Sequence, residues 1–191
     1  MVKVKTGILP FTVPICIAGT MINGKANYAT YGSFGLLSPR PEIYIYIGSQ
    51  GSRYTNIGIK KNRYFSVNIP SEEQMQKTDY VGLVSGHNTD KSAVFNSFFG
   101  SVDTAPMIKE CPVNILCKLV KTADLPNREI FFGEVIESYV NEECLTEGIL
   151  DFKKINPILF TMNGPGNASY WKLEEIIGAA YKEGKNILKN R

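Results

Sequence analysis

The sequence contains a single histidine among 191 residues, which removes most sites that are built on imidazole groups. Its four cysteines, Cys16, Cys111, Cys117 and Cys144, are scattered, and the spacing of Cys111 and Cys117 matches neither a C-x-x-C redox pair nor a common zinc motif. A metal site is therefore not expected. We expect buried, reduced thiols that pack as small apolar side chains, and only a redox role for Cys111 or Cys117 stays open.

Long hydrophobic runs are also missing. No stretch approaches the roughly 20 apolar residues of a membrane-spanning helix. The apolar run between Ile8 and Ala18 is interrupted by Pro10 and Pro14, so no signal peptide is indicated. The net charge is only +3, and basic residues gather only in residues 182–191, where cations suit a helix C-terminus. We therefore expect a cytoplasmic protein without a membrane or nucleic-acid partner.

Recognisable catalytic groups are equally scarce. The sequence has no paired carboxylates, no nucleophile beside a base and no G-x-G-x-x-G fingerprint of a dinucleotide-binding domain. The composition of 43% hydrophobic and 20% charged residues excludes disorder and favours one folded domain over residues 1–191. If the chain binds a phosphorylated cofactor, that cofactor supplies the reaction.

β-branched and aromatic runs at short spacing predict a mainly β fold. Strands are predicted at residues 13–18, 25–32, 42–48, 64–69, 114–122, 130–140 and 157–160. The turn-rich segment TADLPN between the two longest runs indicates an antiparallel hairpin. Alternating βαβ units are missing, so an antiparallel barrel with flanking helices fits better than a doubly wound sheet. We expect the strand at 157–160 to close this sheet.

Helices are fewer. The capping box Ser71-Glu72-Glu73-Gln74 predicts a helix from about Ser71 to Val84, and a shorter one is expected from Thr55, its N-cap, to Lys61. A short helix is also expected after Asp90. Apolar spacing predicts a C-terminal helix whose buried face would hold Leu173, Ile176, Ile177, Ala180 and Ile187, although Gly178 and Gly184 weaken it.

Three polar clusters stand at predicted strand or helix ends, at residues 27–33, 49–56 and 85–91. The first has small side chains that let a flat ring lie close to the backbone, or it is an ordinary polar edge strand. The second offers Arg53 as a bidentate phosphate donor, or it is a surface turn. The third combines free backbone N–H groups, hydroxyls and Lys91, which is the equipment for holding a phosphate. His87 in that cluster could bond a ligand or only serve the turn.

The order of several blocks carries a resemblance. After a first strand containing Pro14, the chain runs NYATYGSF, Pro39-x-Pro41, RYTNIGI, FSVNIP, DYVGLVSGHNTDK, ECPVNILC and IFFGEV, and ends with YWKLEEIIGAAYKEGKNIL. This succession resembles the flavin reductase-like, FMN-binding split-barrel family, and most closely its flavoredoxin branch. The resemblance covers nearly the whole chain. It implies a six-stranded antiparallel split β-barrel that binds FMN non-covalently, as a homodimer with the flavin near the subunit interface.

The same resemblance implies which residues hold the cofactor. It places one group along the flavin and its ribityl chain: Asn27, Ala29, Thr30 and Ser33. It places a second group at the phosphate: Ser52, Arg53, Thr55, Ser85, Gly86 and Lys91. Arg128 stands where this branch often has histidine, so it would face either an anionic flavin edge or an anionic electron donor. Phe160 and the pair Tyr170-Trp171 are expected near the ring.

The implied function is electron transfer through FMN, with a hydride passing from NADH or NADPH to the flavin, as in a flavin reductase. The alternative is a flavoredoxin-type electron carrier that is reduced by a protein partner such as ferredoxin and has no NAD(P)H turnover of its own. A rival outside flavin chemistry is a haem-binding barrel, which would depend on His87 or a thiol for axial ligation.

Overall fold

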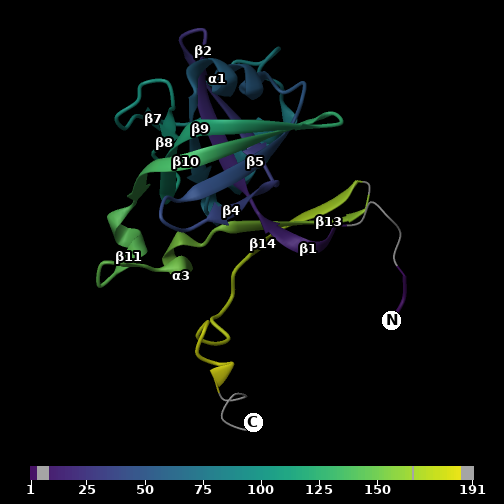
Figure 1. Cartoon of the computed structure of the whole chain (residues 1–191), viewed down its shortest axis with the longest axis vertical. Helices are drawn as coiled ribbons and strands as arrows, with labels where there is room; N and C mark the ends of the chain where they lie inside the picture. The colour runs from purple at the N-terminus through teal and green to yellow at the C-terminus, as the bar shows by residue number, and fades with distance from the viewer. Residues whose placement is uncertain (4–8, 165, 186–191) are drawn as a thin grey trace.

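The computed structural model describes residues 1–3, 9–164 and 166–185. Its centre is a seven-stranded antiparallel sheet in the order β3-β2-β6-β9-β10-β5-β4 (Figure 1). The strands are β2 (Cys16–Ile22), β3 (Lys25–Tyr31), β4 (Phe34–Ser38), β5 (Tyr44–Gln50), β6 (Tyr64–Ile69), β9 (Val113–Leu125) and β10 (Arg128–Val140). The mainly β prediction is confirmed, and the β9–β10 hairpin turns at Asn127, whose φ is 60°.

The sheet curls without closing. Its two edge strands, β3 and β4, are consecutive in the chain and are linked only by Gly32 and Ser33. Within this link the Ser33 carbonyl accepts a hydrogen bond from the Gly48 N–H of β5 at 2.7 Å, next to the β4–β5 ladder. The expectation of six barrel strands is wrong, because the sheet has seven strands and remains open between β3 and β4.

A second sheet takes the strands that were expected to begin and close the barrel. It consists of β1 (Leu9–Pro14), β13 (Ile158–Gly164) and β14 (Asn167–Lys172) in the order β1-β13-β14. The predicted single strand at 13–18 is divided at Ile15, since Pro14 has no N–H with which to continue a ladder. The segment at 157–160 therefore pairs with β1 and not with the central sheet.

Helix α1 (Tyr54–Asn62) follows β5, and η1 (Glu72–Gln74) leads into α2 (Met75–Leu83). The capping box between Ser71 and Gln74 is present as predicted. Thr55 is not an N-cap, because α1 already begins at Tyr54 and the Thr55 hydroxyl accepts a hydrogen bond from Asn27. The helix expected after Asp90 is also wrong: the Asp90 carboxylate accepts from the Ser92 N–H in a turn, and the chain continues towards β7.

The remaining elements are short. They are β7 (Ser97–Phe98), β8 (Met107–Ile108), η2 (Glu142–Cys144), β11 (Leu145–Thr146), β12 (Ile149–Leu150) and α3 (Phe152–Ile155). No helix in the described part of the chain is long and apolar enough to cross a bilayer. One core cluster, which includes Phe65 and Phe131, fills the curled sheet, and a second around Tyr28 packs between the sheet and α2.

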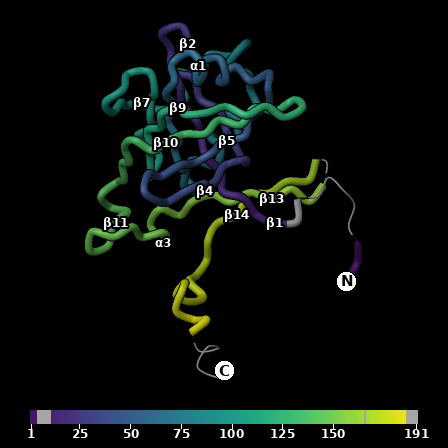
Figure 2. Tube along the Cα trace, viewed as in Figure 1, coloured from purple at the N-terminus to yellow at the C-terminus, as the bar shows by residue number. Residues whose placement is uncertain are grey.

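The predicted C-terminal helix is wrong over the residues described. Residues 173–184 form an irregular segment with turns that leaves the body of the molecule (Figure 2). The exposed fractions of Ile176, Ile177 and Tyr181 are 83%, 98% and 97%, so the described residues leave most of the expected apolar face uncovered. A short helix containing Gly178 is not stable without such packing. Ile187 lies outside the described residues.

Candidate functional site

Two cavities adjoin at the end of the sheet where β5 meets α1. The first, which we name the anion cavity, has a volume of about 220 Å³ and lies between the loop of residues 50–55 and the segment 82–91. The second, the apolar cavity, has a volume of about 560 Å³ and is lined by residues of β1, β4, β5, β10 and β13. Gln50 and Arg53 belong to the walls of both. One elongated ligand can therefore occupy both cavities.

Lys91 is the central charge of the anion cavity. Its residue is only 3% exposed, and its ammonium group donates to the carbonyls of Val81 at 3.2 Å and Val84 at 3.3 Å, at the end of α2. Burial, together with the nearby positive charge of Arg53, lowers the pKa of Lys91 to about 8. Among the ion pairs of the described residues, neither Lys91 nor Arg53 has a carboxylate partner. Two adjacent cations without a counter-ion favour an anionic ligand.

The backbone at Gly86 forms another wall of this cavity. A Cβ at this position would overlap the Asn27 side chain and the Tyr54 ring. The Asn27 amide in turn donates to the Thr55 hydroxyl at 2.9 Å, which ties β3 to α1. Since no side chain fits at Gly86, the segment Ser85–Gly86 presents backbone groups to the cavity. This is the kind of surface that accepts a phosphate closely.

The apolar cavity has a different character. Its walls include Val13, Phe34, Ile130, Phe160 and Met162, and no Asp, Glu, His or Lys is among the described residues that line it. Polar groups are contributed by Thr30, Ser33 and Gln50, and by the guanidinium groups of Arg53 and Arg128. Arg53 lies over the ring of Tyr31, with its guanidinium carbon 5.4 Å from the ring centroid. Such a cavity suits a flat ring system with polar edges.

The aromatic residues expected near the ring are not all there. Phe160 lines the apolar cavity, and its ring centroid lies 5.8 Å from that of Tyr170. Tyr170 and Trp171 do not line it: the Tyr170 hydroxyl donates to Asp79 at 2.8 Å, and Trp171, which is 55% exposed, donates to the Thr161 hydroxyl at 2.8 Å. Tyr170 therefore ties the second sheet to α2.

The other polar candidates lie at the edge of the site or away from it. The His87 ring packs against Tyr54, with centroids 4.8 Å apart, and both line a third cavity of about 280 Å³ that also borders Asn27, Gly86 and Lys91. All four cysteines are buried and unbonded, as expected. Burial raises the pKa values of Cys111 and Cys117, which disfavours reactive thiolates. The described residues contain no cluster suited to a metal ion.

The structure brings the twelve residues of the predicted site to the walls of these three neighbouring cavities. The anion cavity takes Ala29, Ser52, Arg53, Thr55, Ser85, Gly86 and Lys91; the apolar cavity takes Thr30, Ser33, Arg53, Arg128 and Phe160; and the third takes Asn27. Sequence reasoning missed Gln50 and Tyr54, which line the anion cavity. Both belong to the polar cluster after the strand at 42–48, and this position is the signal that could have found them.

A family model and several solved structures are similar to this chain over most of its length. The family model described as "Flavin reductase like domain" matches residues 7–160. The flavoredoxin structure from Methanosarcina acetivorans is 39% identical, covers 98% of this chain and 98% of its own, and has a TM-score of 0.92. Flavoredoxin of Desulfovibrio vulgaris (Miyazaki F) is 26% identical, with coverages of 96% and 100% and a TM-score of 0.85. An FMN-binding protein from Thermus thermophilus, 19% identical with coverages of 94% and 96% and a TM-score of 0.76, shares the fold.

Proposed function

The chain belongs to the flavin reductase-like family, and from this premise we propose that it binds FMN non-covalently in the two adjoining cavities and transfers electrons through it. The observation that carries the proposal is the buried Lys91 ammonium, which has no carboxylate partner in the described chain and lines the anion cavity, next to the larger apolar cavity. A ligand with an anionic end and an apolar ring system satisfies both features.

Different residues would bind the phosphate, the ribityl chain and the ring of the cofactor. Lys91, Arg53 and the backbone at Ser85 and Gly86 would hold the phosphate, while the ribityl chain would pass Gln50, which lines both cavities. The ring would lie between the apolar walls, where Thr30 and Ser33 can hydrogen-bond its edge. When bound, FMN supplies the electron-transfer chemistry. The protein's part is to bind the cofactor, exclude water from one side of the ring and set the charge around it.

The described residues that line the apolar cavity include two arginines and no carboxylate or histidine. This lining suits hydride transfer, since that step requires no protein proton donor. We propose a nicotinamide donor, NADH or NADPH, that stacks directly on the flavin. Arg128 at the rim of the cavity would attract its negative charge.

A second candidate function is a flavoredoxin-type electron carrier reduced by a protein partner. The 39% identity to a flavoredoxin over nearly the whole chain favours it. It differs from the first candidate only in the source of electrons, because both need the same bound FMN.

The experiment has two stages. The purified protein should be yellow or should bind FMN in a titration, and FMN should bind more tightly than riboflavin; a protein that binds neither refutes the proposal. Anaerobic stopped-flow mixing of the FMN-loaded protein with NADH and then NADPH follows. Rapid loss of the oxidised flavin absorbance supports the reductase, and reduction only by ferredoxin supports the carrier.

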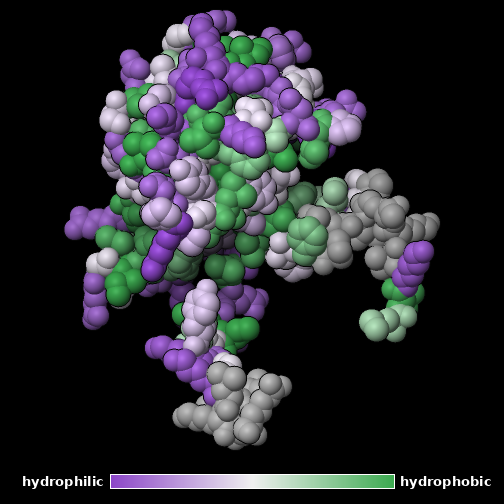
Figure 3. Space-filling model, viewed as in Figure 1, coloured by the Kyte–Doolittle hydropathy of each residue, from purple (hydrophilic) through white to green (hydrophobic). Residues whose placement is uncertain are grey.

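We further propose that two copies associate. Large apolar side chains are exposed on the irregular segment 173–184, and Ile149, Leu150 and Phe152 are also exposed, at 70%, 45% and 57%. Figure 3 shows apolar atoms gathered on the lower part of the body, over β11 and α3. A contiguous apolar surface of this kind favours a protein interface. Light scattering after gel filtration tests this, and a monomeric mass refutes it.

A further inference from the structure

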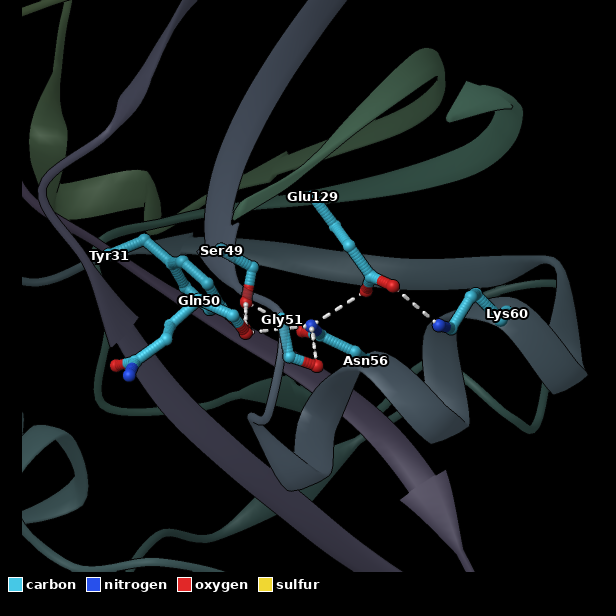
Figure 4. Close-up of polar contacts among 7 residues, drawn as sticks. All are labelled: Tyr31, Ser49, Gln50, Gly51, Asn56, Lys60 and Glu129. Carbon is cyan, nitrogen blue, oxygen red and sulfur yellow. Dashed lines mark hydrogen bonds and ion pairs between the residues drawn. The ribbon is translucent and has the colours of Figure 1, made fainter. Parts of the chain in front are cut away.

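Four polar side chains form one connected cluster behind the loop of residues 50–53, outside both cavities. They are Ser49, Asn56, Lys60 and Glu129 (Figure 4). The loop is important because Gln50 and Arg53 line both cavities and Ser52 lines the anion cavity. Whatever fixes this loop also fixes the groups that the cofactor would contact.

Asn56 is the centre of the cluster. Its residue is 1% exposed, and its side-chain carbonyl accepts from the Ser49 hydroxyl at 2.6 Å. Its amide nitrogen donates to the Gln50 carbonyl at 2.9 Å, to the Glu129 carboxylate at 2.8 Å and, at 3.4 Å, to the Gly51 carbonyl. Only a primary amide offers a donor and an acceptor in this arrangement. The side chain thus connects the end of β5, the loop and β10.

Glu129 fixes Asn56 from the other side. One carboxylate oxygen accepts from Asn56, and the other accepts from the Lys60 ammonium group at 2.7 Å. The Glu129 side chain is 17% exposed, whereas that of Lys60 is 48% exposed. Glu129 therefore supplies a partly buried acceptor for Asn56, and its ion pair with Lys60 lies at the surface.

We propose that Asn56 is a positioning residue for cofactor binding, and that Glu129 acts through it. Asn56 holds the carbonyls of Gln50 and Gly51, and this sets the direction of the loop that carries Ser52 and Arg53. Neither Asn56 nor Glu129 lines the anion or the apolar cavity, so neither touches the cofactor itself. This inference rests on the proposed FMN function.

If Glu129 and Lys60 acted on FMN binding only through their charges, their substitutions would change the FMN affinity in a different way from that expected for positioning. Removing the negative charge of Glu129 would strengthen the binding of an anionic ligand, and removing the positive charge of Lys60 would weaken it. Positioning predicts instead that loss of the Glu129 acceptor weakens binding, whereas loss of Lys60 has little effect. The direction of each change therefore distinguishes the two explanations.

Three variants separate the charge, the acceptor and the ion pair. Glu129→Ala removes the negative charge and the acceptor, and Glu129→Gln keeps an acceptor without the charge. Lys60→Gln removes the positive charge and the ion pair but leaves the Glu129 acceptor in place. We expect Glu129→Ala to raise the FMN dissociation constant about tenfold, because one buried hydrogen bond is lost. Glu129→Gln and Lys60→Gln should stay within about twofold of wild type, since exposed ion pairs contribute little.

Fluorescence titrations with FMN and riboflavin give the dissociation constants, and urea unfolding of the FMN-free variants gives their stability. Asn56→Ala should raise the FMN dissociation constant as Glu129→Ala does. If this buried variant fails to fold, the Glu129 variants alone test the inference. The inference is overturned if Glu129→Ala binds FMN as tightly as wild type, or if Lys60→Gln weakens FMN binding as much as Glu129→Ala does. In either case, FMN binding by the wild-type protein leaves the proposed function standing. A wild-type protein that binds no FMN overturns the proposed function and this inference with it.

Discussion

Asn27 on β3 donates a 2.9 Å hydrogen bond to the hydroxyl of Thr55 in the first turn of α1, and both side chains are buried. The bond joins two segments that border the anion cavity from different sides. Gly86, a third wall, lies directly against Asn27, where no larger residue fits. The shape of the cavity therefore depends on one buried pair contributed by residues 28 positions apart in sequence.

Thr55→Val should test this pair. Valine keeps the shape of threonine but removes the acceptor, which leaves the buried Asn27 donor unpaired and should lower the free energy of unfolding by about 1–3 kcal/mol. Urea unfolding of the FMN-free protein measures this change. Thr55→Ser is the matched control because it keeps the hydroxyl. Equal stability of the valine variant and wild type would show that Asn27 finds another partner.

Lys91→Ala should distinguish FMN from riboflavin. Only FMN carries the phosphate, so loss of one charge-assisted contact should weaken FMN binding by roughly 1.5–3 kcal/mol and riboflavin binding much less. Fluorescence titration of both ligands against wild type and variant gives the difference. An equal loss for the two flavins would show that Lys91 does not contact the phosphate.

The binding of FMN should also depend on pH. The pKa of Lys91 in the FMN-free protein is lowered to about 8 from its ordinary value of 10.5, mainly by burial. A bound phosphate favours the ammonium form, so binding takes up a proton above pH 8, and FMN affinity should fall between about pH 8 and 10. Calorimetry in buffers of different ionisation enthalpy measures the uptake. Lys91→Ala should abolish it, and riboflavin should show none.

The same shift affects the stability of the FMN-free protein. Because the pKa of Lys91 is lower in the folded than in the unfolded state, the unfolded chain binds more protons between about pH 8 and 10. The contribution of Lys91 to the free energy of unfolding therefore rises with pH in this window. A wild-type stability that rises relative to that of Lys91→Ala confirms the sign, and parallel profiles contradict it.

Much of this site could be predicted from the sequence because its parts are local. The segment from Ser85 to Lys91 already contains the hydroxyl, the glycine and the lysine of the anion cavity, and Arg53 and Thr55 follow a strand that its composition identifies clearly. The family resemblance then assigned these separate segments to one cofactor site. The capping box at Ser71 was equally local, and it was confirmed.

The features that sequence reasoning missed depend on contacts between distant segments. Whether Pro157–Phe160 closes the barrel is decided by its pairing with β1, which the apolar pattern of either segment does not specify. The spacing of Leu173, Ile176 and Ile177 predicts a helical face, yet a helix needs a surface to pack against, and the described residues leave these side chains largely exposed. The sequence placed Asn56 in the polar cluster at 49–56 but did not indicate its role, since its partners come from β5, the following loop and β10.

A substitution at Arg128 should distinguish its two proposed roles, a contact with the anionic electron donor or a contact with the flavin edge. Arg128 is exposed at the rim of the apolar cavity, it does not line the anion cavity, and the described residues give it no carboxylate partner. We therefore expect Arg128→Ala to leave the FMN dissociation constant within about twofold and to raise the KM for the anionic donor by about tenfold, the loss expected for a charge-assisted contact. Arg128→Lys keeps the charge without the planar donor fork, so its KM for the donor should lie between those of wild type and Arg128→Ala. Steady-state reduction with NADH, NADPH and reduced ferredoxin measures each KM. A tenfold weaker FMN affinity in Arg128→Ala would instead place the guanidinium on the flavin edge, because in that case the arginine would contribute to the bound cofactor before any donor arrives.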